Sequence, residues 1–132
     1  MNSNLLNTVT NVLHTNEHVV FAYLLGSAVN SDMYNDIDIA VYVINYKDPF
    51  TITSDLKYEL YTQTGIPADT FDIRIINDIP VKGDLFALLY LKDVFEKGLL
   101  LVDKSPYIHS DFLECYSLKY RECEGLFAEV LS

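Results

Sequence analysis

Three aspartates lie in two apolar segments that otherwise have the composition of buried strands. Asp36 and Asp38 belong to the segment DIDIAVYV, and Asp72 belongs to the segment TFDIRII. Side chains alternate between the two faces of a strand, so Asp36 and Asp38 share one face. Asp72 shares a face with Arg74 for the same reason. Removing a carboxylate from water costs several kcal/mol unless it is paired or bound to a metal, so these aspartates are candidates for chemistry.

Carboxylates that converge on one face of a sheet repel one another unless a cation lies among them. If the two strands are neighbours, Asp72 approaches Asp36 and Asp38 across about 5 Å of strand spacing. Oxygen ligands favour Mg²⁺ or Mn²⁺, and two such ions about 3.5–4 Å apart suit an in-line phosphoryl transfer. One ion would bind nucleotide phosphates, and the other would lower the pKa of an attacking hydroxyl. We therefore predict a site for two metal ions at Asp36, Asp38 and Asp72.

A Gly-Ser pair, Gly26 and Ser27, follows the apolar run HVVFAYLL that precedes the aspartates. Glycine at this place lets the backbone approach a ligand, and the N–H and hydroxyl of Ser27 would face a phosphate. A lone Gly-Ser pair is more often a plain turn, so the signal is the ordered set of Gly-Ser, Asp-x-Asp and a third aspartate. Arg74 either binds phosphate oxygens or only neutralises the acidic cluster, and the sequence leaves both roles open.

The spacing of the apolar residues predicts an α+β (α/β) domain built on a mixed β-sheet. Each of the two aspartate-bearing strands has one apolar face. We therefore expect helices packed on one face of the sheet, with the aspartates on an open face. The predicted strands are near 18–25, 36–44, 70–76 and 99–103, and the helices precede 18, end near Gly65, cover 81–98 and follow 103.

Length and composition fit one domain over residues 1–132. No apolar run approaches the roughly 18–20 residues of a membrane span, and the N-terminus lacks the pattern of a signal peptide, so we expect a cytoplasmic protein. The formal net charge of −10 argues against a nucleic-acid partner bound by a broad basic surface. Cys115 and Cys123 fall on one predicted helix, about 12 Å apart along its axis, which is too far for a disulfide.

Four segments together resemble the minimal nucleotidyltransferase (MNT) branch of the DNA polymerase β-like nucleotidyltransferase superfamily. By this resemblance, Gly26 and Ser27 would bind nucleotide phosphates. Asp36, Asp38 and Asp72 would be metal ligands, with Asp72 activating the acceptor hydroxyl. The loop AVNSDMYN after Ser27 is shorter than is usual in the family and lacks its arginine and second glycine. The segments are LLGSAVNSDMYNDIDIAVYV, FDIRIIND, LLYLKDVFEKGLLLVD and FLECYSLKYRE.

The resemblance implies a metal-dependent transfer of a nucleoside monophosphate, AMP from ATP, onto a hydroxyl. Many minimal members act as antitoxins by adenylylating a tyrosine of a partner HEPN toxin, so such a toxin is the implied acceptor. Two alternatives stay open. A binding module of the same fold would have lost turnover and would mask its partner, and a purely structural domain would carry the acids incidentally. Charge repulsion between the carboxylates disfavours the structural domain.

Overall fold

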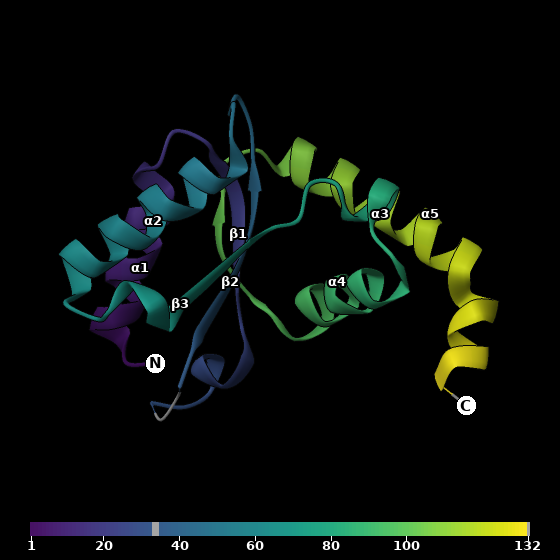
Figure 1. Cartoon of the computed structure of the whole chain (residues 1–132), viewed down its shortest axis with the longest axis horizontal. Helices are drawn as coiled ribbons and strands as arrows, with labels where there is room; N and C mark the ends of the chain where they lie inside the picture. The colour runs from purple at the N-terminus through teal and green to yellow at the C-terminus, as the bar shows by residue number, and fades with distance from the viewer. Residues whose placement is uncertain (33–34, 132) are drawn as a thin grey trace.

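The computed structural model describes residues 1–32 and 35–131 of the chain. Helices and strands alternate along most of this length, and two short 3₁₀ turns, η1 and η2, precede β2 and β3 (Figure 1). The elements are α1 (Ser3–Thr15), β1 (Val19–Leu25), η1 (Gly26–Val29), β2 (Ile37–Val43), α2 (Pro49–Thr64), η2 (Ala68–Thr70), β3 (Phe71–Ile75), α3 (Ile79–Lys82), α4 (Leu85–Lys97), β4 (Leu99–Asp103) and α5 (Pro106–Leu131).

The four strands form one mixed sheet in the order β3-β2-β1-β4. Strand β1 is antiparallel to both β2 and β4, whereas β2 and β3 are parallel. The predicted mixed sheet and the α+β class are therefore confirmed, and so is the adjacency of the strands predicted near 18–25, 36–44 and 70–76. The two strands that carry the aspartates lie side by side.

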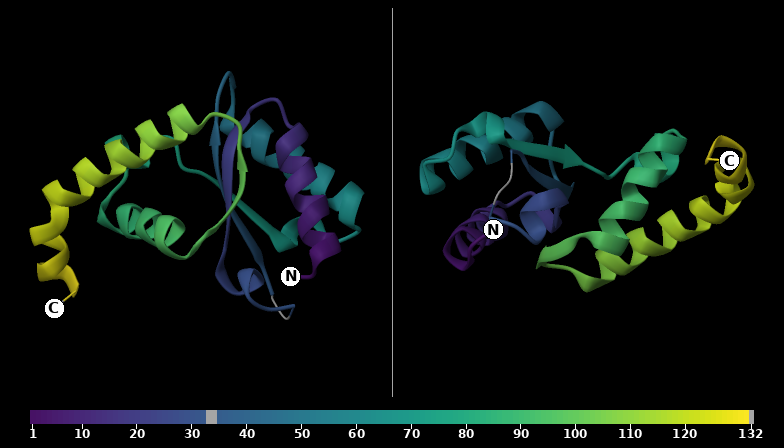
Figure 2. Two further views of the ribbon diagram at one scale, coloured as in Figure 1. Left: turned by 180° about the vertical axis from the view of Figure 1, so that it is seen from behind. Right: turned by 90° about the horizontal axis from the view of Figure 1, so that it is seen from below.

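Helices cover both faces of the sheet, whereas the sequence led us to expect them on one. Helices α1 and α2 pack on one face, and α3, α4 and α5 lie on the other (Figures 1 and 2). The signal for this was in β1, where all seven residues are buried, because a continuous apolar strand needs cover on both faces. The face that carries the aspartates is thus closed over its middle. On this face, Asp72 and Arg74 are exposed and Asp38 is half-buried.

The helix predicted over 81–98 is two helices, α3 and α4, separated at Gly83. A side chain at Gly83 would bring its Cβ within 2.6 Å of the carbonyl oxygen of Ile79, so glycine suits the sharp end of α3. Asp84 then caps α4 by accepting a hydrogen bond from the N–H of Ala87 at 2.9 Å. This break turns α4 back along the aspartate face.

Two further expectations concern the whole chain. Cys115 and Cys123 both lie on α5 and are free, as predicted. Within the described residues, no helix has the length and apolar character that crossing a membrane requires.

Candidate active site

Strand β1 ends in a turn that brings its backbone against a carboxylate. Gly26 has a φ of 75°, a left-handed conformation that glycine adopts without strain. A Cβ at this position would lie 3.1 Å from Oδ2 of Asp38, so the missing side chain also leaves room for that carboxylate. Both Gly26 and Ser27 are exposed at the start of η1. The Gly-Ser pair is therefore accessible and directly beside the Asp-x-Asp motif.

The loop after this turn is tied to the start of the chain. The amino group of Met1 donates hydrogen bonds to the carbonyl oxygens of Ala28 at 2.9 Å and Ser31 at 2.6 Å. It also lies 3.2 Å from a carboxylate oxygen of Asp32. Part of the short loop noted in the sequence, residues 33–34, lies outside the described residues. The described part of the loop is thus tied to the amino group of Met1 through two carbonyl oxygens and the Asp32 carboxylate.

Asp38 and Asp72 face each other across the parallel pair β2 and β3, where they are register partners. The flanking residues of β2, Ile37 and Ile39, are fully buried on the opposite face, which confirms the predicted alternation. Asp38 is half-buried and Asp72 is exposed. Two like charges directly opposite each other in a sheet are destabilising.

Electrostatics bring the third carboxylate into the same cluster. Burial raises the pKa of Asp38 above its usual value, and the charges of Asp72 and Asp36 raise it further. Asp36 itself is exposed, just before β2 begins. Asp36 and Asp72 therefore both lie close enough to Asp38 to raise its pKa.

These carboxylates fit a hard cation by their chemistry, because oxygen-only ligand sets are what Mg²⁺ and Mn²⁺ prefer. In the described part of the chain, however, no three carboxylate, imidazole or thiol groups are gathered closely enough to hold an ion between them. The predicted ligands are neighbours, and their side chains do not surround a common point in this arrangement.

Arg74 lies on the aspartate face, two residues beyond Asp72 and opposite Ala40 of β2. Its side chain is exposed, and its Cζ lies 4.2 Å from the centroid of the Tyr90 ring. Burial raises the pKa of Tyr90 to about 12; the charge of Arg74 lowers it, whereas those of Asp38 and Asp72 raise it. Tyr90 is thus part of the site, although helical spacing alone presents it as an ordinary apolar-face residue of α4.

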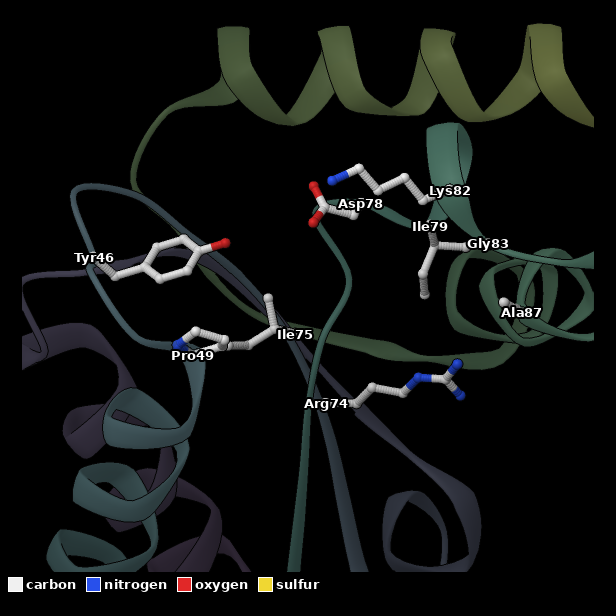
Figure 3. Close-up of a pocket in the computed structure, with 9 residues that line it drawn as sticks. All are labelled: Tyr46, Pro49, Arg74, Ile75, Asp78, Ile79, Lys82, Gly83 and Ala87. Atoms are coloured by element: carbon white, nitrogen blue, oxygen red, sulfur yellow. The ribbon is translucent and has the colours of Figure 1, made fainter.

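A pocket of about 370 Å³ lies at Arg74, and Asp36, Asp38 and Asp72 are not among its lining residues (Figure 3). Arg74 and Lys82 put two cationic side chains on its wall, and Asp78 is its acidic residue. Figure 3 shows the Arg74 guanidinium directed toward α4, with Lys82 and Asp78 across the pocket. The remaining lining residues are Tyr46, Pro49, Ile75, Ile79, Gly83 and Ala87. The size is within the range of small-molecule sites.

The structure thus places the Gly26-Ser27 turn beside the Asp-x-Asp strand and brings the third aspartate, Asp72, into register with Asp38 on the next strand. Residues 7–106 match the family described as polymerase beta, nucleotidyltransferase. The chain belongs to this family, and the predicted family and enzyme class are confirmed. No curated protein matches the chain.

Solved structures share the fold over the whole chain. A chain in the complex of tri-AMPylated Shewanella oneidensis HEPN toxin with MNT antitoxin is 18% identical, with a TM-score of 0.62 and full coverage of both chains. A chain of the toxin-antitoxin MntA-HepT is 16% identical, with a TM-score of 0.61 over 99% of this chain and 100% of that one. A chain of a toxin-antitoxin structure with AMP-PNP is 17% identical, with a TM-score of 0.61 and full coverage of both. At these identities the likeness establishes the fold.

Proposed function

We propose that the protein is a metal-dependent nucleotidyltransferase that moves AMP from ATP onto a hydroxyl group. The observation that carries the proposal is that η1, β2 and β3 bring three residues together. Gly26, which has no side chain, lies beside Asp38, and Asp38 is in register with Asp72. Membership of the polymerase beta nucleotidyltransferase family supports the reaction class. The fold shared with a toxin-antitoxin structure that contains AMP-PNP supports a nucleoside triphosphate as the donor.

Each part of the site has a task in this reaction. The exposed backbone of Gly26 and Ser27 binds the outer phosphates, with the Ser27 hydroxyl as a further donor. Asp36, Asp38 and Asp72 would hold Mg²⁺, which when bound would neutralise phosphate charge and lower the pKa of the acceptor hydroxyl. Burial raises the pKa of Asp38, and the charges of Asp72 and Asp36 raise it further. A divalent cation bound here would stabilise the charged form of the carboxylate.

The transfer step needs a proton acceptor beside the incoming hydroxyl. Asp72 is the exposed member of the pair and lies on β3, the edge strand of the sheet, where an acceptor can approach. The acceptor oxygen bonds to the α-phosphorus, the bond to the bridging oxygen breaks, and pyrophosphate leaves toward Gly26 and Ser27. The proton passes from the hydroxyl to the carboxylate of Asp72.

The proposed acceptor is a tyrosine hydroxyl of a HEPN toxin, and the protein would act as its antitoxin. One structural neighbour is a complex with an AMPylated HEPN toxin, and the two others described above are toxin-antitoxin structures. The test is incubation of the purified chain with α-labelled ATP, Mg²⁺ and lysate of its own source, followed by identification of the labelled protein and residue. Label on a HEPN protein that disappears with Asp72→Asn, and persists with the exposed helix variant Asp55→Asn, supports the proposal. A HEPN partner that binds the chain and gains no label contradicts it.

A second candidate is a nucleotide- or partner-binding module of the same fold with little turnover. The spread of the three carboxylates, which surround no common point, favours this candidate. The two functions differ in one measurement. If the protein is a binding module, its Asp72→Asn variant still binds AMP-PNP with Mg²⁺ and neutralises the toxin as well as the wild type does. If it is an enzyme, the same variant no longer neutralises the toxin.

A further inference from the structure

We infer that Tyr90 is a positioning residue, whose ring holds the guanidinium of Arg74 beside the Asp38–Asp72 pair in the orientation that receives the phosphates of the nucleotide. The inference deepens the proposed function and rests on it. Neither Tyr90 nor Arg74 is a metal ligand, and Tyr90 does not take part in the chemical step.

The contact between the two side chains has the geometry of a cation–π interaction. The Cζ atom of Arg74 lies 4.2 Å from the Tyr90 ring centroid, well inside the range of about 6 Å over which a ring attracts a cation. In the described part of the chain, this is the contact that Arg74 makes, and no carboxylate lies within ion-pair distance of it. Arg74 therefore forms no ion pair with Asp72 or Asp38. Its N–H donors stay available to a ligand.

The ring itself is anchored, whereas the guanidinium is not. Tyr90 lies on α4 between Leu91, which is fully buried, and the half-buried Leu89, and it packs with the core on the aspartate face. Arg74 is exposed and projects from an edge strand. A long exposed side chain loses rotamer freedom when it binds a ligand, and a fixed stacking partner removes part of that cost beforehand.

The site needs a preorganised cation at this place. The loop AVNSDMYN offers no lysine or arginine to a triphosphate, and Arg74 is the only arginine in the first 120 residues. A planar guanidinium can bind two phosphate oxygens at once, which a lysine cannot do. A ring 4.2 Å from Cζ limits the positions that the guanidinium can adopt, so we infer that Tyr90 helps to direct that fork.

The experiment is a calorimetric titration of AMP-PNP with Mg²⁺ into the wild type and into variants at both positions. Tyr90→Leu removes the ring, and we expect binding about three- to fivefold weaker. Tyr90→Phe keeps the ring, so its affinity for AMP-PNP should be within about twofold of that of the wild type. In an Arg74→Met background, Tyr90→Leu should cause no further loss, because the residue that it positions is absent.

Tyr116→Leu is the matched control. Tyr116 is also half-buried, its pKa is also raised to about 12 by burial, and its ring contacts Phe95 with centroids 5.1 Å apart rather than an arginine. Its loss should cost stability and leave AMP-PNP affinity unchanged. If Tyr90→Leu does not fold, Tyr90→Met replaces it, because methionine fills an irregular apolar space without a ring.

Three results would overturn the inference: a folded Tyr90→Leu or Tyr90→Met that binds as the wild type does, an equal loss in the Arg74→Met background, or a Tyr90→Phe as weak as Tyr90→Leu. The last result would assign the function to the hydroxyl. A wild type that does not bind AMP-PNP at all would remove the proposed function together with the inference. If the wild type binds AMP-PNP and substitution of Tyr90 does not change the affinity, only the inference is removed and the proposed function stands.

Discussion

Two polar clusters lie on the same face of the sheet and are built in opposite ways. At one end, Asp38 and Asp72 face each other in register, and no cationic side chain of residues 1–32 and 35–131 lies at ion-pair distance from them. At the other, the ring nitrogens of His109 join two groups, with Nε2 2.6 Å from the hydroxyl of Tyr23 and Nδ1 3.0 Å from a carboxylate oxygen of Asp103. Both clusters place carboxylates against apolar surroundings. Only the second supplies a partner.

The difference separates a structural cluster from a functional one. The Tyr23–His109–Asp103 chain links β1, α5 and β4, so its hydrogen bonds hold the C-terminal helix on the sheet. Burial raises the pKa of Tyr23 to about 12, and the charge of Asp103 raises it too, so its hydroxyl stays protonated and able to donate. Among the described residues, Asp38 and Asp72 form no ion pair that would hold two elements together. Natural proteins keep such local costs where function requires them.

The largest expected effect is on transfer, at the aspartate pair. Asp38→Asn should lower AMP transfer by at least about a hundredfold, because it removes a metal ligand and the charge that faces the phosphates. Its free energy of unfolding should be equal to or slightly above that of the wild type, since the substitution relieves repulsion with Asp72 and Asp36. Urea unfolding checks the stability, and labelled ATP checks the transfer. If Asp38→Asn unfolds, Asp38 has a structural role, and the difference drawn here between the aspartate pair and the Tyr23–His109–Asp103 cluster does not hold.

The opposite pattern is expected at the histidine. His109→Leu should lower the free energy of unfolding by about 2–4 kcal/mol, because it leaves the buried groups of Tyr23 and Asp103 without their partner. Affinity for AMP-PNP should not change, since the cluster lies at the other end of the face. The exposed His14→Leu is the control for a general effect of losing a histidine. Loss of nucleotide affinity with intact folding would show that the two clusters are coupled.

A smaller effect is expected at Arg74. Arg74→Lys should weaken binding of ATP by about three- to tenfold, because lysine carries the charge without the planar fork. Stability should be within about 0.5 kcal/mol of the wild type, as for most exposed positions. Parallel titrations of ATP onto both proteins decide the matter. Equal ATP affinities of the two proteins would show that Arg74 only neutralises nearby carboxylates and does not bind the phosphates through its planar fork.

The smallest effect concerns alkaline stability. The pKa of Tyr23 is about 12 in the folded chain and near its ordinary value of 10.0 when unfolded, so the stability that this tyrosine contributes is complete below pH 10. That contribution is lost as the pH rises toward 12, because the unfolded chain ionises first. Tyr23→Phe should therefore flatten the fall of unfolding free energy over this window. The same slope in the variant and the wild type would show that Tyr23 is not the group that titrates.

The sequence was informative about the site because the site depends on local rules. Alternation along a strand places Asp38 on one face and Ile37 and Ile39 on the other, whatever the rest of the chain does. The order of motifs then brought Asp72 beside Asp38, because two buried strands of one small sheet are commonly neighbours. The expectation of an open face failed at β1, where the continuous apolar run already indicated cover on both sides.

By itself, then, the sequence determined the strands, the faces of the three aspartates, the Gly26-Ser27 turn and the family. Only the tertiary structure decided what faces those residues. Tyr90 meets Arg74 because the break at Gly83 turns α4 back over the sheet, and His109 meets Tyr23 from 86 residues away. Periodicity records which face of an element is apolar, but not which element covers it. Long-range partners arise from packing, which depends on the whole chain at once.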